Sequence, residues 1–142
     1  MRFSAVIAAA LPISLSLAAT TSMKGTVSYD TVYDNSKLST LNIACSDGSH
    51  GLNTKGYKTI GALATFPYVG GAPAVTGWNS AACGSCYQLS YNGTSVYFTA
   101  IDKADTFNMG LNAMNKLTGG KAKKIGVANV TYKKVAESKC GL

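Results

Sequence analysis

The four cysteines, Cys45, Cys83, Cys86 and Cys140, are the side chains of this 142-residue sequence with the most evident chemistry. In a reducing compartment the Cys83-Gly-Ser-Cys86 spacing would favour redox chemistry, and a second such pair would favour zinc. No second pair is present, and His50 is the only histidine. We therefore expect no metal site and interpret the cysteines as two structural disulfides, for which three pairings are open.

Carboxylates are scarce. The chain has Asp30, Asp34, Asp47, Asp102, Asp105 and Glu137. Glycoside hydrolysis requires an acid and a second carboxylate. Asp102 is a candidate because it follows Phe98-Thr-Ala-Ile at an expected strand end, where a side chain can project into a groove. A solvated or turn-capping aspartate is an equal alternative, and the spacing identifies no partner. His50 has no nucleophile in a recognised arrangement, so we predict no catalytic residue.

The N-terminus is typical of an export signal. A positively charged start precedes residues 3–17, which carry no charge. We expect residues 1–18 to be a signal peptide, cleaved near Ala18 or Ala19, and residues 19–142 to form a single secreted domain. The apolar stretch is short for a membrane span, which needs about 20 residues. Secretion places the cysteines in an oxidising environment, where disulfides persist.

The chain is basic, with a formal net charge of +7, and 46% of its residues are hydrophobic. Such a composition can build one core, which argues against a disordered protein. Six lysines fall within residues 121–142. Outside the cell this charge favours acidic polysaccharide or a wall surface over nucleic acid, although a solubilising face is the simplest interpretation. Eight tyrosines and Trp78 suit sugar binding, but we expect most tyrosines to be core or half-buried.

Short β-strands dominate the expected secondary structure. The expected strands cover residues 24–33, 87–91, 96–100 and 124–135. The Asn92-Gly93 dipeptide accepts the two positive φ angles of a type I′ turn, so it predicts a hairpin. About six strands around one core predict a small, mainly β barrel, which leaves no exposed sheet edge.

Two other segments position the candidate residues. A single helix is expected over residues 109–118, with Asn108 as its N-terminal cap and Gly119-Gly120 at its end. Residues 66–85 are rich in Gly and Pro, and we interpret them as an ordered loop held by Cys83 and Cys86.

A set of motifs occurs in one order along the chain. They are Ser28-Tyr29-Asp30, Cys45-Ser-Asp-Gly-Ser-His50, Gly77-Trp78-Asn-Ser, Cys83-Gly-Ser-Cys86, Ala100-Ile101-Asp102 and Phe107-Asn108. This order, from about residue 27 to the C-terminus, resembles the cerato-platanins, small secreted proteins of filamentous fungi. The resemblance implies a six-stranded double-ψ β-barrel, expansin- and barwin-like, with one or two short helices. It also implies the disulfides Cys45–Cys83 and Cys86–Cys140.

The resemblance also implies a function. It predicts binding of chitin fragments (N-acetylglucosamine oligomers), non-hydrolytic loosening of cellulose or other wall polysaccharide, and recognition by a plant receptor as a defence elicitor. Asp102 and Asn108 would lie in the binding groove, with Tyr29 and His50 nearby. Hydrolytic relatives carry a Phe-Asp motif where this chain has Phe107-Asn108, and an amide cannot transfer the proton. The expectation is therefore a protein that is not an enzyme.

Two other functions remain open at this point. One is weak glycoside hydrolysis, and the other is a surface-active structural role in the fungal cell wall, with self-assembly of an otherwise monomeric protein. Asn92-Gly-Thr94 and Asn129-Val-Thr131 are glycosylation sequons, and Asn92 is expected to be the more accessible. No cofactor, nucleic acid or membrane span is expected.

Overall fold

The computed structural model of the chain describes residues 21–142. The expected signal peptide, residues 1–18, lies outside the described residues. Among those that are described, no helix has the length and apolar character needed to cross a membrane.

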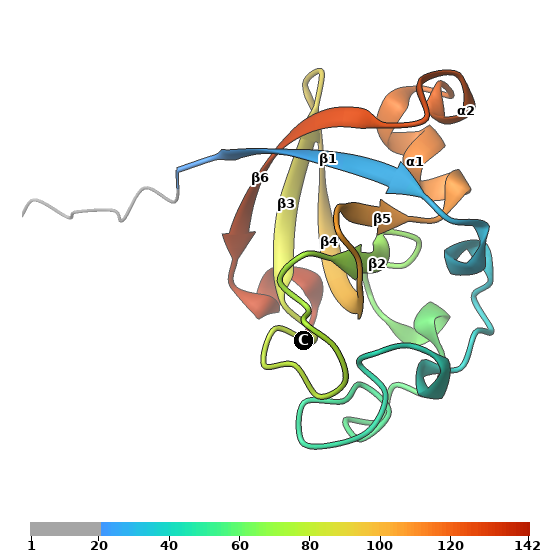
Figure 1. Cartoon of the computed structure of the whole chain (residues 1–142), viewed down its shortest axis with the longest axis vertical. Coiled ribbons are helices and arrows are strands. Elements are labelled where there is room, and N and C mark those ends of the chain that lie inside the picture. The colour runs from blue at the N-terminus through green and yellow to red at the C-terminus, as the bar shows by residue number, and fades with distance from the viewer. Residues whose placement is uncertain (1–20) are drawn as a thin grey trace, which may run out of the picture.

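Six strands form a closed barrel (Figure 1). They are β1 (Met23–Tyr29), β2 (Val69–Ala72), β3 (Cys86–Tyr91), β4 (Thr94–Lys103), β5 (Phe107–Met109) and β6 (Ala128–Val135). Their order around the barrel is β1-β5-β2-β4-β3-β6, so neighbours in space are mostly distant in sequence. The β1–β5 and β2–β4 pairs are parallel. The predicted six-stranded double-ψ β-barrel is therefore confirmed.

Short helices decorate the barrel. The α-helices are α1 (Leu111–Thr118) and α2 (Ala122–Ile125), and the 3-10 helices are η1 (Thr31–Asp34), η2 (Thr40–Asn42), η3 (Ile60–Ala62) and η4 (Glu137–Cys140). In Figure 1, α1 and α2 lie at one end of the barrel, and the long loops on either side of β2 lie at the other. The barrel therefore has one end covered by α-helices and another end covered by long loops.

The predicted hairpin is confirmed. Six residue pairs join β3 to β4, from Cys86 opposite Thr99 to Tyr91 opposite Thr94. Asn92 and Gly93 have φ angles of 43° and 83°, as a type I′ turn requires. The local sequence is sufficient here because the turn residues and the alternating strands favour the same structure.

An aromatic cluster fills the barrel interior. The ring centroids of Phe107 and Tyr132 lie 4.8 Å apart, and those of Phe107 and Tyr87 lie 5.2 Å apart, in edge-to-face geometry. Phe98 contacts Phe107 in the same way at 5.7 Å. Such pairs contribute about 0.5–1.5 kcal/mol each beyond simple burial. Most tyrosines are buried or half-buried, as expected, and Tyr97 is the exposed one.

The expected role of Asn108 as a helix cap is wrong. Asn108 lies within β5, and α1 begins at Leu111 after Gly110, which provides no side-chain cap. The Asp34 carboxylate does this instead, accepting a hydrogen bond from the Asn112 backbone N–H at 2.9 Å. Local sequence could not reveal a cap that is supplied from 78 residues away.

Two expected strands are shorter than predicted. The strand expected over 24–33 ends at Tyr29, because the Asp30 carboxylate accepts a hydrogen bond from Val32 N–H and caps η1. The strand expected over 124–135 begins at Ala128, because residues 122–125 form α2. A side-chain-to-backbone hydrogen bond therefore ends strand pairing after β1, and a helical turn delays it before β6.

The interpretation of residues 66–85 as a loop missed β2. This short strand lies between β4 and β5, and a Cβ atom on Gly70 would overlap the carbonyl oxygen of Asn108. A Cβ on Gly71 would collide with the Cβ of Ala104 at 2.5 Å. The glycines that suggested a loop are therefore required by close packing inside a sheet.

Both disulfides implied by the resemblance are confirmed. Cys45 is bonded to Cys83, and Cys86 is bonded to Cys140. The first joins the loop before η3 to the loop after β2, and the second joins β3 to η4. Each bridge connects elements that no strand pairing links directly.

Candidate functional site

One row of residues runs across four neighbouring strands. Ser28 of β1 is paired with Asn108 of β5, Asn108 with Gly71 of β2, and Gly71 with Asp102 of β4. Directly paired residues project from the same face of a sheet. Phe107 and Met109 are buried on either side of Asn108, so this face is the outer one. The barrel topology thus brings Asp102 and Asn108 together.

The connection between β4 and β5 folds over the centre of this row. Ala104 lies above Gly71, and the Thr106 hydroxyl is 3.0 Å from that of Ser28. The side-chain oxygen of Asn108 is buried beneath this cover and has no hydrogen-bond partner among the described residues. Buried amide oxygens normally have a partner, so this atom is an unsatisfied acceptor enclosed next to the row.

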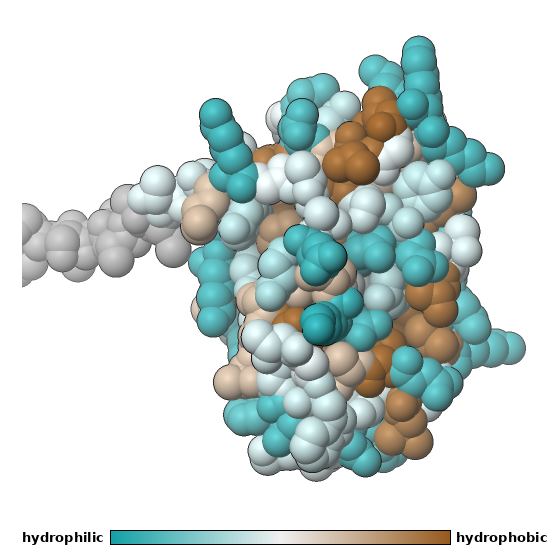
Figure 2. Space-filling view, in the orientation of Figure 1, coloured by the Kyte–Doolittle hydropathy of each residue, from teal (hydrophilic) through white to brown (hydrophobic). Residues whose placement is uncertain are grey.

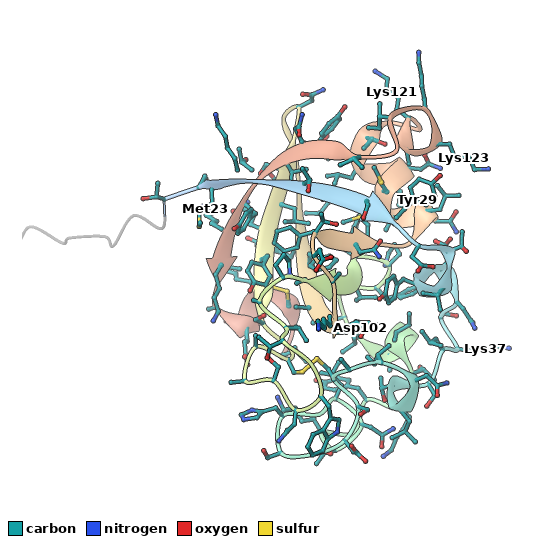
Figure 3. The ribbon with its side chains drawn as sticks, viewed as in Figure 1. Met23, Tyr29, Lys37, Asp102, Lys121 and Lys123 are labelled. Atoms are coloured by element: carbon teal, nitrogen blue, oxygen red, sulfur yellow. A yellow bond between two sulfur atoms is a disulfide. The ribbon has the colours of Figure 1, made fainter. Side chains whose placement is uncertain are left out.

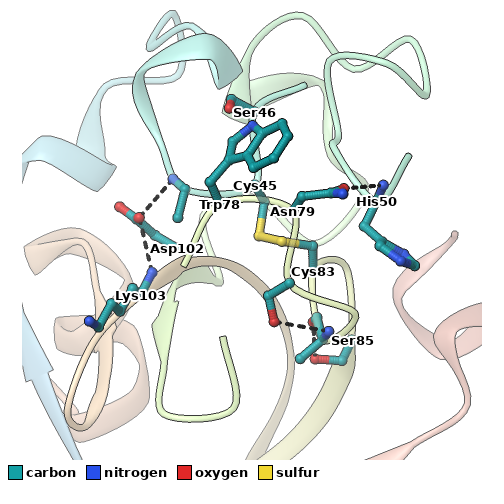
Figure 4. The surroundings of a disulfide bond; sticks show 12 residues. Cys45, Ser46, His50, Trp78, Asn79, Cys83, Ser85, Asp102 and Lys103 are labelled. Carbon is teal, nitrogen blue, oxygen red and sulfur yellow. Dashed lines mark hydrogen bonds between the residues drawn. A yellow bond between two sulfur atoms is a disulfide. The ribbon is translucent and has the colours of Figure 1, made fainter. Parts of the chain in front are cut away.

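Asp102 is held by three donors from the protein, of which the two backbone N–H groups are drawn in Figure 4. Its Oδ1 accepts the backbone N–H groups of Ala44 at 2.9 Å and Lys103 at 3.0 Å, and its Oδ2 accepts the Tyr33 hydroxyl at 2.8 Å. Hydrogen bonds to a carboxylate contribute about 1.5–3 kcal/mol. Asp102 therefore has a structural role in addition to any contact with a ligand.

Tyr33 is the clearest titration anomaly of this region. Its side chain is only 5% exposed. Burial raises the pKa of Tyr33 far above its ordinary value of 10.0, and the hydrogen bond to Asp102 and the charges of Asp102 and Asp30 raise it further. Tyr33 consequently remains a neutral donor to Asp102 across the physiological pH range.

Two loops form the end of the barrel next to Asp102. The loop over residues 45–53 closes on itself, with Leu52 N–H donating to the Cys45 carbonyl and Asn53 N–H to that of Ser46. The loop over residues 73–83 is joined to it by the Cys45–Cys83 disulfide. Backbone bonds from Cys45 to Ile101 and from Gly84 to Ala100 attach both loops to β4. The carboxylate and the loops thus form one connected structure.

Two side-chain contacts lock these loops together. The Trp78 indole Nε1–H donates to Asp47 Oδ1 at 2.6 Å, and the His50 backbone N–H donates to Asn79 Oδ1 at 2.8 Å. Asn79 adopts a φ of 56°, which directs its amide across to the neighbouring loop. Trp78 nevertheless remains 63% exposed. The result is an indole side chain that is fixed in position but open to solvent.

The four predicted site residues do not converge on one point. Asp102 and Asn108 share the row described above. Tyr29 packs against the core and lies toward the α1 and α2 end, well apart from Asp102 in Figure 3. His50 lies across the Cys45–Cys83 disulfide from Asp102, with its ring directed away (Figure 4). Sequence order alone could not separate these positions.

Two residues of this end were not among the predicted site residues. In the sequence, Tyr33 is only one residue of an expected strand, because its importance depends on its long-range hydrogen bond to Asp102. Trp78 gave a usable signal, because it is the only tryptophan and lies among glycines just before a cysteine pair. An aromatic residue in a loop just before a cysteine pair is a candidate contact residue.

Two lysines of the lysine-rich segment lie at the other end of the barrel. Lys121 and Lys123 are at the α1 and α2 end, opposite the end that carries Asp102 (Figure 3). No group of three or more His, Cys, Asp or Glu side chains within residues 21–142 could hold a metal ion. The face near Asp102 therefore combines two carboxylates, amide groups and an aromatic ring, and these groups can bind polar, uncharged ligands.

Both glycosylation candidates border a separate shallow hollow. Its volume is about 510 Å³, and Lys24, Ser90, Asn92, Asn129 and Thr131 contribute to its lining. Asn92 is exposed at the hairpin tip, and Asn129 is exposed on the outer face of β6. A glycan at either position would stand away from Asp102 and would leave that end uncovered.

The fold and this site define a class: a small six-stranded barrel with two disulfides and an exposed polar and aromatic face. The cerato-platanin family model matches residues 25–142, and this chain belongs to the cerato-platanin family. It is 42% identical over 145 residues to the heat-stable 19 kDa antigen of Coccidioides immitis, covering 100% of this chain and 99% of that protein.

Solved structures agree with this assignment. The crystal structure of cerato-platanin 2 from M. perniciosa matches with a TM-score of 0.81 and 38% identity, covering 84% of this chain and 100% of that one. The solution structure described as that of the fungal elicitor cerato-platanin matches with a TM-score of 0.72 and 37% identity, covering 81% of this chain and 95% of that one. The family and its barrel are therefore shared across these proteins.

Proposed function

We propose that this chain is a secreted, non-catalytic carbohydrate-binding protein. Its ligands would be N-acetylglucosamine oligomers of chitin, and it would loosen cellulose without cleaving it. The observation that carries the proposal is the row in which Asp102 and Asn108 flank Gly71 and are both partly exposed. A carboxylate beside an amide offers both acceptors and donors, which sugar hydroxyls and acetamide groups require.

The same row argues against hydrolysis. The position that would hold a second carboxylate holds the amide of Asn108, which cannot act as an acid or base. Asp102 already accepts three hydrogen bonds, an arrangement that suits an acceptor-only carboxylate rather than a proton donor. Binding without cleavage is the function that these groups support.

Export and recognition by a host belong to the same proposal. Residues 1–18 would direct secretion, and residues 19–142 would be the mature domain that reaches the cell wall. A structural neighbour is described as a fungal elicitor, and we extend that role to this chain, with recognition by a plant receptor. A surface-active role in the fungal wall would depend on exposed apolar side chains and not on the row.

An NMR titration tests the binding proposal. Unglycosylated protein would be titrated with chitin oligomers of two to six sugars, following backbone amides and the Asn108 side-chain NH₂. We expect saturable shifts centred on Asn108 and Asp102, which increase with oligomer length. Asn108→Ala should weaken binding, whereas Asn129→Ala, which removes an exposed strand amide on β6, should not.

Product analysis separates binding from catalysis. Reducing ends released from chitin and from cellulose should stay at the level of a protein-free control, while cellulose loosening is measured on the same samples. Sustained release of reducing ends would support the glycosidase alternative. Absence of any shift with chitin oligomers, together with unaltered surface activity of Asn108→Ala, would favour the wall-surface alternative instead.

A further inference from the structure

Trp78 combines high exposure with a fixed orientation. It is the only tryptophan of the chain, and 63% of its side chain is exposed. An unrestrained indole would reorient freely, but here its Nε1–H donates to the Asp47 carboxylate at 2.6 Å. This charge-assisted bond fixes the edge of the ring and leaves the aromatic surface open.

The loop beneath the ring is shaped to receive it. A Cβ atom on Gly48 would lie 3.1 Å from Trp78 Cζ2 and 2.7 Å from Asn79 Oδ1, so only glycine fits at that position. Asn79 in turn holds the backbone of His50. The ring therefore rests on a loop that is closed by its own backbone hydrogen bonds and joined to the neighbouring loop by the Cys45–Cys83 disulfide. Its placement before binding lowers the entropy cost of binding.

The surroundings of Trp78 are polar. The other large apolar side chains that are exposed within residues 21–142 are Met23, Val32, Leu41, Tyr97, Ile125 and Val127, and none belongs to the two loops. In Figure 2 the loop after β2, at the lower left, is pale or teal, whereas brown residues lie near the top and along the right side of the view. A membrane-inserting surface or a hydrophobic obligate interface needs a contiguous apolar patch, which these loops lack.

The charged side chains near Trp78 indicate which class of ligand this end favours. Asp47 lies at the edge of the indole ring. Asp102 lies on the same end of the barrel, on the side of the Cys45–Cys83 disulfide opposite His50 (Figure 4). These two carboxylates are offset by Lys55 beside Gly84, Lys58 beside Asn53 and Lys103 beside Asp102, so this end has no strong charge that would select an acidic or a basic ligand. An aromatic face has a negative quadrupole, which attracts the slightly positive C–H groups on the flat face of a pyranose ring. The matching ligand is a neutral sugar polymer.

We propose that Trp78 is a stacking platform for one pyranose ring of a β-1,4-linked chain, with Asp47 as the residue that positions it. This inference rests on the proposed carbohydrate-binding function and adds a second contact point, on the disulfide-linked loops. It predicts that the platform acts mainly on long chains and on polymer surfaces, because a short oligomer held by the row need not reach it.

The single tryptophan provides a direct readout. Intrinsic fluorescence of the full-length secreted protein would be followed during titration with N-acetylglucosamine hexamer and with cellohexaose, in parallel with pull-down on insoluble chitin and cellulose. We expect a saturable change in Trp78 emission and protection from acrylamide quenching. Trp78→Ala should weaken polymer binding about five- to tenfold, the size expected for loss of one aromatic contact.

Matched variants separate stacking from folding. Trp78→Phe retains an aromatic ring and should retain part of the affinity even if Trp78→Ala loses stability. Asp47→Asn should weaken binding less than Trp78→Ala, because the ring remains but is less firmly held. Tyr97→Ala removes an exposed aromatic residue from outside the two loops and should leave binding unchanged.

The two proposals fail in different ways. If amides near Asn108 shift with chitin hexamer while Trp78 emission and the Trp78→Ala affinity stay unchanged, the platform is wrong and the proposed function stands. If Trp78 responds but Asn108→Ala has no effect, the platform stands and the row is wrong. An emission change with phosphatidylserine vesicles, but with neither sugar, would overturn the sugar assignment. The response to each of the two hexamers identifies which polymer is bound.

Discussion

Asp102 and Tyr33 together connect three parts of the molecule that are far apart in sequence. The Tyr33 hydroxyl comes from η1, the Ala44 N–H from the loop before the first cysteine, and the carboxylate that accepts both from β4. This arrangement gives Asp102 a structural role beside the binding role proposed for it. Experiments on this residue must therefore separate binding from stability.

Substitution of Asp102 should affect folding as well as binding. Asp102→Ala leaves the Tyr33 hydroxyl and the Ala44 N–H without their acceptor, so we expect the free energy of unfolding to fall by about 2–4 kcal/mol. Asp102→Asn keeps one acceptor oxygen and should cost about half as much. Urea denaturation of the three proteins measures the difference. Equal stability of Asp102→Ala and wild type would contradict the hydrogen-bond assignment.

Tyr33 should make stability depend on pH at the alkaline end. Because burial and the bond to Asp102 raise its pKa, the unfolded chain loses the phenol proton above about pH 10 while the folded chain keeps it. The stabilisation is complete below pH 10, and the free energy of unfolding then falls by up to ~1.4 kcal/mol per pH unit.

Denaturation curves between pH 8 and 11 test this expectation. Tyr33→Phe should have a shallower decline than wild type, although not a flat one, because burial also raises the pKa of Tyr68. Tyr97→Phe, at an exposed position, serves as the control. An identical slope for wild type and Tyr33→Phe would show that Tyr33 is not protected from ionisation.

Among the elements, β2 has the position with the strictest packing requirements. It is only four residues long and fully buried, yet it bridges β4 and β5 and places Asn108 and Asp102 on its two sides. Parallel pairing with β4 requires a long crossover, so its partner is set by the fold of the whole chain. The row of the site therefore depends on the glycines of this strand.

Gly70→Ala should disrupt the site by disrupting β2. The new methyl group would overlap the Asn108 carbonyl, so we expect a loss of about 3 kcal/mol or more in the free energy of unfolding. Gly56→Ala is a matched control, because Gly56 has a φ of +98° but no atom within 4 Å of an added Cβ, and it should cost only ~1–2 kcal/mol. Thermal denaturation of both variants measures the contrast, and equal losses would refute the packing argument.

At the scale of the whole molecule, the two disulfides act on different regions. Cys45–Cys83 joins the two loops that hold Trp78, whereas Cys86–Cys140 ties the C-terminal turn to β3. Sequence separations of 38 and 54 residues give about 4 kcal/mol of stabilisation each from loop closure, which is an upper figure. The two disulfides therefore stabilise the fold by similar amounts but restrain different segments of the chain.

Removing each disulfide in turn should separate these effects. Replacing Cys45 and Cys83 by serine should lower the melting temperature and also increase acrylamide quenching of Trp78, since the loops are no longer joined. Replacing Cys86 and Cys140 should lower the melting temperature comparably and leave the quenching of the folded protein unchanged. If both pairs of substitutions alter Trp78 equally, the loops are not held independently by the first bridge.

The sequence alone determined those features in which local signals agree. The Asn92-Gly93 turn and its alternating flanks specify the hairpin, and the order of motifs identified the family, its barrel and the cysteine pairing. Asp102 and Asn108 could also be selected from motif positions. These features depend on the preferences of short segments or on a pattern shared with known proteins, so no knowledge of the tertiary contacts was needed.

Only the tertiary structure decided which distant groups meet. Close packing between strands turned a glycine-rich segment into β2, and the Asp34 carboxylate replaced Asn108 as the group that caps α1. The fold also separated Tyr29 from Asp102 and fixed Trp78 through Asp47. Each of these outcomes depends on a contact between residues at least 30 positions apart or on strand pairing across the barrel. Local propensity contains no information about such contacts, because they exist only once the barrel has closed.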